Sequence, residues 1–235
     1  MNKYLLPILL LATALSISHI IPNQAQSVKK KPIQQIFSWT KISQALFSPK
    51  PPIKPRKGGS RDPLFICMIS PDAPKPHRIV WSDRPLFIWN GSVQKIAVRT
   101  AGSNEDLWSQ TVAATQITNY TGKALQPGQK YDWWVFIGES PNKSVPFQVM
   151  ESQQRDRITS QLRTLENQLK AKGANIEAIA TAKANFFANK QLWSDALQQA
   201  YSVEKPSPEL AQIRQDIPDK LCNQQQTVGS NSPTP

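Results

Sequence analysis

The chain has 235 residues, of which 39% are hydrophobic and 19% charged, a composition that excludes disorder throughout and suits one or two globular domains. Its net charge of +12 is typical of a nucleic-acid-binding protein, but the charge is unevenly placed. Residues 28–61 hold nine Lys or Arg and no acid, whereas residues 62–235 hold 18 basic and 16 acidic residues, a balance of only +2. The folded part is therefore expected to be nearly neutral, which argues against a nucleic-acid partner.

Residues 1–27 have the pattern of a secretory signal peptide. Lys3 precedes an apolar run over residues 5–15, and Ala25-Gln26-Ser27 is a small-x-small triplet that a signal peptidase accepts. A membrane-spanning helix needs about 20 apolar residues, and polar residues dilute this run after Leu15. We therefore expect cleavage after Ser27 and export to the periplasm or the extracellular space, with an uncleaved envelope anchor as the alternative.

Residues 28–61 are expected to form a basic, proline-rich linker, because such a composition buries too little apolar area to fold alone. An alternative is a short interfacial helix over 33–47, whose apolar residues fall roughly on one face and would bind an anionic membrane or envelope polymer. The basic side chains of this tether are Lys29, Lys30, Lys31, Lys41, Lys50, Lys54, Arg56, Lys57 and Arg61.

Residues 62–149 are expected to form an antiparallel β-sandwich. Runs rich in β-branched and aromatic residues recur between turn-forming clusters, and no helix-length periodic stretch interrupts them. The expected strands are 64–69, 79–81, 85–89, 93–99, 107–113, 115–120, 131–137 and 145–149. The segment 125–133, L-Q-P-G-Q-K-Y-D-W, resembles the tyrosine corner of fibronectin type III and immunoglobulin-like domains. That resemblance implies a structural role for Tyr131 and Trp133.

Some of these strands are apolar on both faces. Trp134 and Phe136 lie opposite the face of Trp133 and its alternate neighbours, so a second layer has to cover them, and the helices that follow are the nearest candidate. The alternative is an exposed aromatic platform for sugar rings. Its candidate residues are Trp81, Trp89, Trp108 and Trp134.

Residues 150–222 are expected to form a small helical domain, because apolar residues recur there with a helical period. Helices are expected from 152 to a stop at Gly173, over 176–187 and 192–201, and from Ser207 as N-cap to 221 with a break at Pro218. Residues 175–208 resemble one tetratricopeptide unit, and since one unit cannot form a solenoid, the helices are expected to dock on the sandwich. The polar tail 223–235 is expected to be disordered.

The two cysteines, Cys67 and Cys222, lie near the first expected strand and at the end of the last expected helix. In an oxidising compartment a pair of cysteines indicates a disulfide, which would staple the helices to the sandwich. The alternative is two unpaired buried thiols.

Residues that could carry catalysis are sparse. The chain beyond residue 27 contains one histidine, His77, in a proline-rich connector, so a histidine-based metal cluster cannot be assembled. Glu105-Asp106 follows a turn-forming cluster and provides too few oxygen ligands for calcium. The sequence also lacks nucleophile-elbow and phosphate-loop motifs. We therefore expect no catalytic residues, no metal and no cofactor.

Three motifs together resemble those of the cyanobacterial exported DUF928 family. They are G-G-S-R at 58–61 followed by Cys67, L-Q-P-G-Q-K-Y-D-W-W at 125–134, and L-W-S-D-A-L at 192–197. The likeness spans roughly residues 57–222, although the cysteine lies six residues after Arg61 rather than nearly adjacent to it. The family is uncharacterised, so the resemblance implies an architecture and a compartment but no catalytic residue.

The expectation is therefore an α+β protein, an antiparallel Ig-like β-sandwich followed by a small TPR-like helical domain. Its expected function is that of an exported, non-catalytic interaction module of the cell envelope or periplasm that binds an envelope protein. The alternatives are a carbohydrate-binding module that uses exposed tryptophans and a hydrolase whose site has no recognisable motif.

Overall fold

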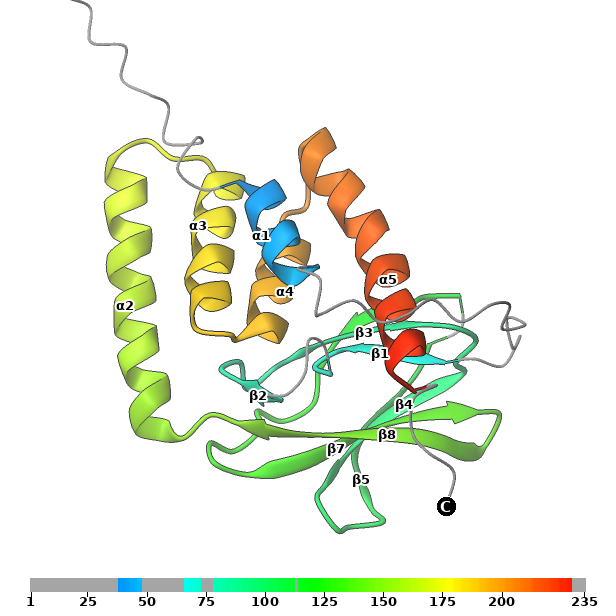
Figure 1. The fold of residues 1–235 in the computed structure, drawn as a ribbon. Coiled ribbons are helices and arrows are strands. Elements are labelled where there is room, and N and C mark those ends of the chain that lie inside the picture. Colours follow the sequence, from blue (N-terminus) through cyan, green and yellow to red (C-terminus); the bar gives the residue numbers. More distant parts are fainter. Residues whose placement is uncertain (1–37, 48–65, 73–77, 113, 230–235) are drawn as a thin grey trace, which may run out of the picture. The chain divides into compact units, whose positions relative to one another are not determined.

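The computed structural model describes residues 38–47, 66–72, 78–112 and 114–229 of the chain and, for residues 223–229, the backbone alone. Within these ranges the protein is an α+β fold, as the sequence predicts, with two β-sheets and several helices (Figure 1). The strands are β1 (Cys67–Ser70), β2 (Ile79–Val80), β3 (Leu86–Asn90), β4 (Lys95–Thr100), β5 (Asp106–Thr111), β6 (Ile117–Asn119), β7 (Lys130–Ile137) and β8 (Ser140–Val149). The helices are α1 (Trp39–Leu46), α2 (Ser152–Ala171), α3 (Ile176–Asn189), α4 (Trp193–Tyr201) and α5 (Pro208–Gly229).

The strands form a three-stranded sheet of order β1-β3-β6 and a five-stranded sheet of order β2-β8-β7-β4-β5. Pairing is antiparallel except between β2 and β8, which run parallel. Consecutive strands β3 and β4 lie in different sheets, as do β5 and β6 and also β6 and β7, so the chain crosses repeatedly between the sheets.

One hydrophobic core lies between the two sheets. Phe87 and Trp89 of β3 pack in the same cluster as Val98 of β4 and Trp133 and Val135 of β7, and all five side chains are fully buried. Alternation explains this, because successive side chains of a strand point to opposite faces. β3 is apolar on both faces, since Leu86 and Ile88 pack in a different cluster.

That second cluster joins the helices to the three-stranded sheet. Leu86 and Ile88 pack with Leu197 of α4 and with Ile217 and Leu221 of α5. The helices therefore cover the outer face of β1 and β3, and the contacts that join α4 and α5 to strands fall on these two strands (Figure 1).

The outer face of β7 is covered in another way, which corrects the expectation that helices would cover it. The Lys95 ammonium group lies 4.6 Å from the centre of the Phe136 ring, and the Arg99 guanidinium lies 5.0 Å from the Trp134 ring. Both cations come from the neighbouring strand β4, so their long side chains shield the aromatic rings while their charges meet Asp106 of β5.

Helix α5 continues through Pro218, so the expected break is wrong. A proline lacks the N–H that would bond the carbonyl four residues earlier, here that of Arg214. The Tyr201 hydroxyl donates to this carbonyl at 2.9 Å and so replaces the missing donor. The start of the helix agrees with the sequence, because the Ser207 hydroxyl accepts the Leu210 amide N–H.

Helix α1 lies inside the stretch 28–61, and for residues 39–46 the expectation of a solvated linker is therefore wrong. Ser38 caps the helix by accepting the Lys41 amide N–H, while Trp39, Ile42 and Leu46 are buried. The segment does not fold alone, as the composition indicates, but its apolar stripe packs against α3 and α5. Of the face that the alternative expectation assigned to membrane binding, Leu46 is buried and Thr40 and Ala45 are exposed, while Ile33, Ile36 and Phe37 lie outside the described residues.

The Cys67–Cys222 disulfide is present, with a Cα–Cα distance of 5.7 Å. It joins β1 to α5 and lies beside the cluster of Leu86 and Ile217, so it staples the helices to the three-stranded sheet. Among the described residues, no helix is both long and apolar enough to cross a membrane.

Replacing Cys222 with Ser should lower the free energy of unfolding by about 5 kcal/mol, because the bridge closes a loop of 155 residues in the unfolded chain. Urea unfolding without reductant measures the loss. The double variant Cys67→Ser/Cys222→Ser is the matched control for a lone thiol and should lose a similar amount. An equal free energy of unfolding of the variant and the unchanged chain would contradict the stabilising role of the disulfide.

Candidate functional site

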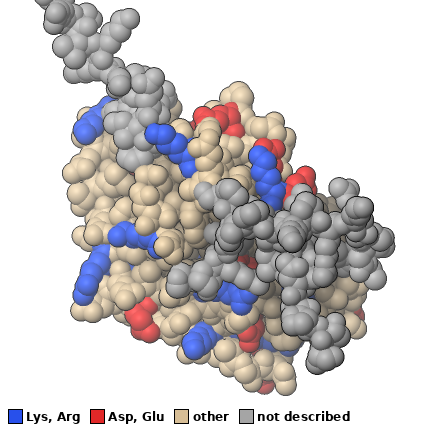
Figure 2. Space-filling view, viewed as in Figure 1, with Lys and Arg blue, Asp and Glu red and all other residues tan. Residues whose placement is uncertain are grey.

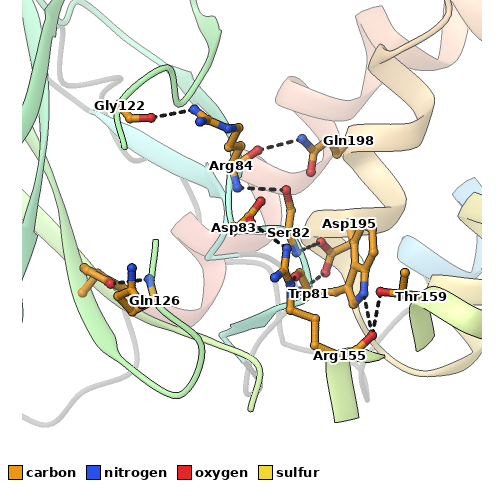
Figure 3. Close-up of polar contacts among 11 residues, drawn as sticks. Trp81, Ser82, Asp83, Arg84, Gly122, Gln126, Arg155, Thr159, Asp195 and Gln198 are labelled. Carbon is orange, nitrogen blue, oxygen red and sulfur yellow. Dashed lines mark hydrogen bonds and ion pairs between the residues drawn. The ribbon is translucent and has the colours of Figure 1, made fainter. Parts of the chain in front are cut away.

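A set of polar contacts between strands and helices surrounds the loop of residues 81–84, which lies between β2 and β3 (Figure 3). The sequence Trp81-Ser82-Asp83-Arg84 exposes several backbone donors and acceptors where no strand partner satisfies them. Side chains from α2 and α4 meet these groups. We call this set of contacts the junction.

Asp195 of α4 is the centre of the junction. Its Oδ2 accepts the Trp81 amide N–H at 2.8 Å and its Oδ1 accepts the Ser82 amide N–H at 2.9 Å (Figure 3). The residue is only 1% exposed. Burial raises the pKa of Asp195 to about 7, against the amide hydrogen bonds and the Arg155 charge, which lower it.

Arg155 of α2 holds the other side of the same loop. Its Nε donates to the Trp81 carbonyl at 2.9 Å, and its guanidinium pairs with the Asp83 carboxylate at 2.8 Å. In return, the Trp81 indole N–H donates to the Arg155 carbonyl, which also accepts the Thr159 hydroxyl (Figure 3). One loop is therefore fixed from two helices at once.

Further hydrogen bonds extend the junction along α4. Gln198 Nε2 donates to the Arg84 carbonyl at 2.8 Å, one helical turn after Asp195. The hydroxyls of Ser194 and Ser70 lie 2.9 Å apart in a buried contact between α4 and β1. Contacts from two successive turns of α4 thus reach both the disulfide-bearing strand and the loop.

The chemistry of the junction favours a structural role. Both Asp195 oxygens already accept backbone N–H groups, and the Arg155 guanidinium already meets a carbonyl and a carboxylate. The described residues contain no group of three or more His, Cys, Asp or Glu placed to hold a metal ion. A cavity between α1, α4 and α5 measures about 10 Å³, far below the volume of a substrate site.

Tyr131 occupies the position that the tyrosine-corner pattern predicts. Its hydroxyl accepts the Gln126 amide N–H at 2.8 Å, across the Pro127-Gly128 turn. Gly128 has φ +78°, and a Cβ there would lie 2.6 Å from the Glu151 carboxylate, so the turn requires glycine. Trp133 is fully buried between the sheets.

The four tryptophans expected as an aromatic platform lie in four different environments. Trp89 is fully buried between the sheets and is not available to a ligand. Trp81 is half-buried, 5.4 Å from the Phe187 ring, and Trp108 packs against Phe87 and Tyr120. Trp134 is half-buried beneath Arg99. The structure does not bring these rings together on one surface.

Of the basic tether residues, only Lys41 falls within the described part of the chain, where it lies exposed on α1. Lys29, Lys30, Lys31, Lys50, Lys54, Arg56, Lys57 and Arg61 lie outside the described residues.

The sequence motifs predict no role for Asp195 or Arg155. A signal for Asp195 exists, because it interrupts the apolar stripe of Leu192, Ala196 and Ala200, and a carboxylate on the buried face of a helix requires a partner. Arg155 has no such signal, since it lies on a helix with many charged residues.

Asp195→Asn should remove a pH dependence of stability. Because the folded-state pKa is raised from 3.8 to about 7, the folded protein keeps this proton at pH values where the unfolded chain has released it. The free energy of unfolding of the unchanged chain therefore falls as the pH rises through this window, by at most about 1.4 kcal/mol per pH unit. In urea unfolding from about pH 5 to about pH 8, the difference in free energy of unfolding between the unchanged chain and the uncharged Asn variant should become smaller as the pH rises. A constant gap would contradict the assignment.

Tyr131→Phe should lower the free energy of unfolding by about 1–2 kcal/mol, because the Gln126 N–H loses its acceptor. Tyr120→Phe is the matched control, since Tyr120 lies in the same core and its hydroxyl makes no hydrogen bond to a described residue. Thermal or urea unfolding measures both variants. A loss at Tyr131 no larger than that at Tyr120 would rule out the corner bond as a stabilising contact.

Comparison with known families and curated proteins adds no information on function, so the function has to be inferred from the sequence and the structure. No family model matches the chain, and no curated protein matches it. The likeness to the DUF928 family therefore rests on the three motifs of the sequence alone and stays a prediction.

Proposed function

We propose that the protein is an exported, non-catalytic interaction module of the cell envelope or periplasm, and that its partner is another protein. The observation that carries this proposal is the Cys67–Cys222 disulfide, which links the sheets to the helices. Disulfides persist mainly in oxidising compartments outside the cytoplasm. The signal-peptide pattern of residues 1–27 supports the same compartment.

We favour binding over catalysis because the polar groups of the junction already have partners within the fold. Asp195 and Arg155, the groups of the junction that could act as acid or cation, are engaged with backbone and side-chain partners. The small cavity beside α1 supports the same preference, because substrate sites are much larger. The hydrolase alternative has no comparable support from the described residues.

The finer description of the fold is part of this proposal. The strand orders β1-β3-β6 and β2-β8-β7-β4-β5, together with the Tyr131 corner, support an Ig-like sandwich. The landmarks Phe187, Trp193, Ala196 and Pro208 support one TPR-like helical unit in α3 and α4 and at the start of α5. Membership of the DUF928 family would fit both parts.

Two other classes of partner are less favoured. A sugar platform needs flat, exposed aromatic faces, whereas the four candidate tryptophans are buried or packed against other side chains. On the face shown in Figure 2, basic and acidic side chains are interspersed among uncharged ones, which does not favour a nucleic-acid partner. Binding of the 28–61 tether to an anionic membrane or envelope polymer remains a proposal beside the protein partner.

The compartment is tested by expressing the full chain with residues 1–27 in a Gram-negative host, followed by fractionation and thiol alkylation in denaturant without reductant. We expect a periplasmic or envelope protein with no alkylated cysteine. Cytoplasmic protein with both cysteines alkylated would contradict export.

The class of partner is tested by co-purification from the envelope of the source organism at low and high salt. A protein partner that is retained at high salt is the expected result, because apolar contacts resist screening. Retention at low salt alone, with release at high salt, would instead assign the interaction to the basic tether and an anionic surface. Retention of no protein at either salt concentration would contradict the proposal.

A further inference from the structure

The two sides of the five-stranded sheet differ in how they are protected against a further strand. On one side β2 pairs with β8 only at Gln148 and Val149, so the rest of β8 has no described strand beside it. That part of β8 carries Pro141, Lys143 and Pro146, residue types that keep an edge strand from pairing with another chain. On the other side lies β5, which contains neither proline nor lysine.

Two residues of β5 direct their backbone groups away from the sheet. The Val112 amide N–H donates to the Gln94 carbonyl at 2.8 Å, so the even-numbered residues at this end of β5 are the ones that exchange hydrogen bonds with β4. The N–H and C=O groups of Ser109 and Thr111 therefore point to the free edge. Both residues are exposed, and no described strand pairs with this edge.

A β-bulge limits the free edge to the second half of the strand. The register changes between Val98 and Arg99 of β4, which leaves Leu107 as an extra residue on β5. A bulge interrupts regular pairing, so a strand added to β5 has to pair with the residues that follow the bulge. The available segment is 108–112, which we call the β5 edge.

The backbone of the β5 edge is complementary to itself. When two copies of the segment pair antiparallel about Gln110, Ser109 of each copy lies opposite Thr111 of the other. These are the two residues whose N–H and C=O groups are free, so each pair can exchange both of its hydrogen bonds. The hydroxyl side chains of Ser and Thr also suit direct cross-strand contact.

The remaining side chains match in the same register. Trp108 lies opposite Val112, and both belong to the apolar side of the strand that packs on the core between the sheets. Gln110 faces its own copy, and because an amide both donates and accepts, the two side chains can bond each other. The segment carries no charged residue, so self-pairing brings no like charges together.

Other arrangements fit less well. Centring the pair on Ser109 would place Trp108 opposite Gln110 and would include the bulged Leu107. A strand of a different protein could also satisfy the free backbone groups, but its side chains would have to supply the hydroxyl, amide and apolar contacts in the order that a second copy provides. The side chains therefore favour a second copy of this chain as the occupant.

We propose that the protein forms a two-fold symmetric dimer in which the β5 edges of two copies pair antiparallel about Gln110. The two five-stranded sheets then form one continuous sheet, and the same patch serves on both sides of the interface, as in most homodimers. This dimer goes beyond the proposed function, because neither the envelope compartment nor a protein partner requires it.

Sedimentation equilibrium of the disulfide-bonded chain, over about a hundredfold range of protein concentration, tests the proposal. We expect a reversible dimer whose fraction rises with concentration. Ser109→Pro removes an N–H of the free edge without removing a bond to β4, so it should shift the chain to monomer. Ser109→Ala keeps this N–H, is the matched control, and should dimerise as the unchanged chain does.

A pair of charge variants tests the register and does not depend on proline. Ser109→Lys/Thr111→Lys places ammonium groups directly opposite each other across the two-fold axis and should give a monomer. Ser109→Lys/Thr111→Glu places opposite charges in the same positions and should restore the dimer. Far-ultraviolet circular dichroism checks that each variant keeps its fold.

Three outcomes would overturn the proposal. A monomer at every concentration would leave the β5 edge to a strand of a different protein. A dimer that survives both Ser109→Pro and the two-lysine variant would assign dimerisation to another surface. A Lys/Glu variant that stays monomeric would contradict the pairing of Ser109 with Thr111. None of these results would alter the compartment and co-purification tests of the proposed function.

Discussion

The buried carboxyl group of Asp195 is the contact on which the arrangement of sheets and helices depends. It satisfies two backbone N–H groups of the β2–β3 loop from the buried face of α4, and Arg155 holds the same loop from α2. A carboxyl group is expensive to bury, so it stabilises only the one arrangement that supplies both donors. The disulfide then fixes α5 to β1 at the other end of the same interface.

Much of the fold was predictable because local sequence patterns indicate where its strands, helices and turns lie. Alternating apolar residues marked the strands, the i, i+4, i+7 stripe marked α2, and Ser207-Pro208 marked the start of α5. The Pro-Gly turn before Tyr131 predicted a contact that the structure contains. The pairing of Cys67 with Cys222 followed from their number and compartment, since two cysteines leave a single disulfide.

The errors came from contacts between residues far apart in sequence. Pro218 does not break α5 because the Tyr201 hydroxyl bonds the carbonyl that proline leaves free. Residues 39–46 have the composition of a linker but form a helix, because α3 and α5 provide an apolar surface for it. The outer face of β7 needs no helix because Lys95 and Arg99 lie over its rings. The local sequence around each of these residues does not show which distant residue contacts it.

Because the junction and the disulfide join them, the sheets and the helices are expected to unfold as a single cooperative unit. Urea unfolding of the disulfide-bonded variant Trp39→Phe/Trp193→Phe, followed by far-ultraviolet circular dichroism and by tryptophan fluorescence, tests this most directly. Helices dominate the first signal, and without the tryptophans of α1 and α4 the second signal reports mainly on the sheets, including Trp89 and Trp133 of their core. The account predicts coincident transitions. Separate transitions, with the helices unfolding before the sheet core, would contradict it.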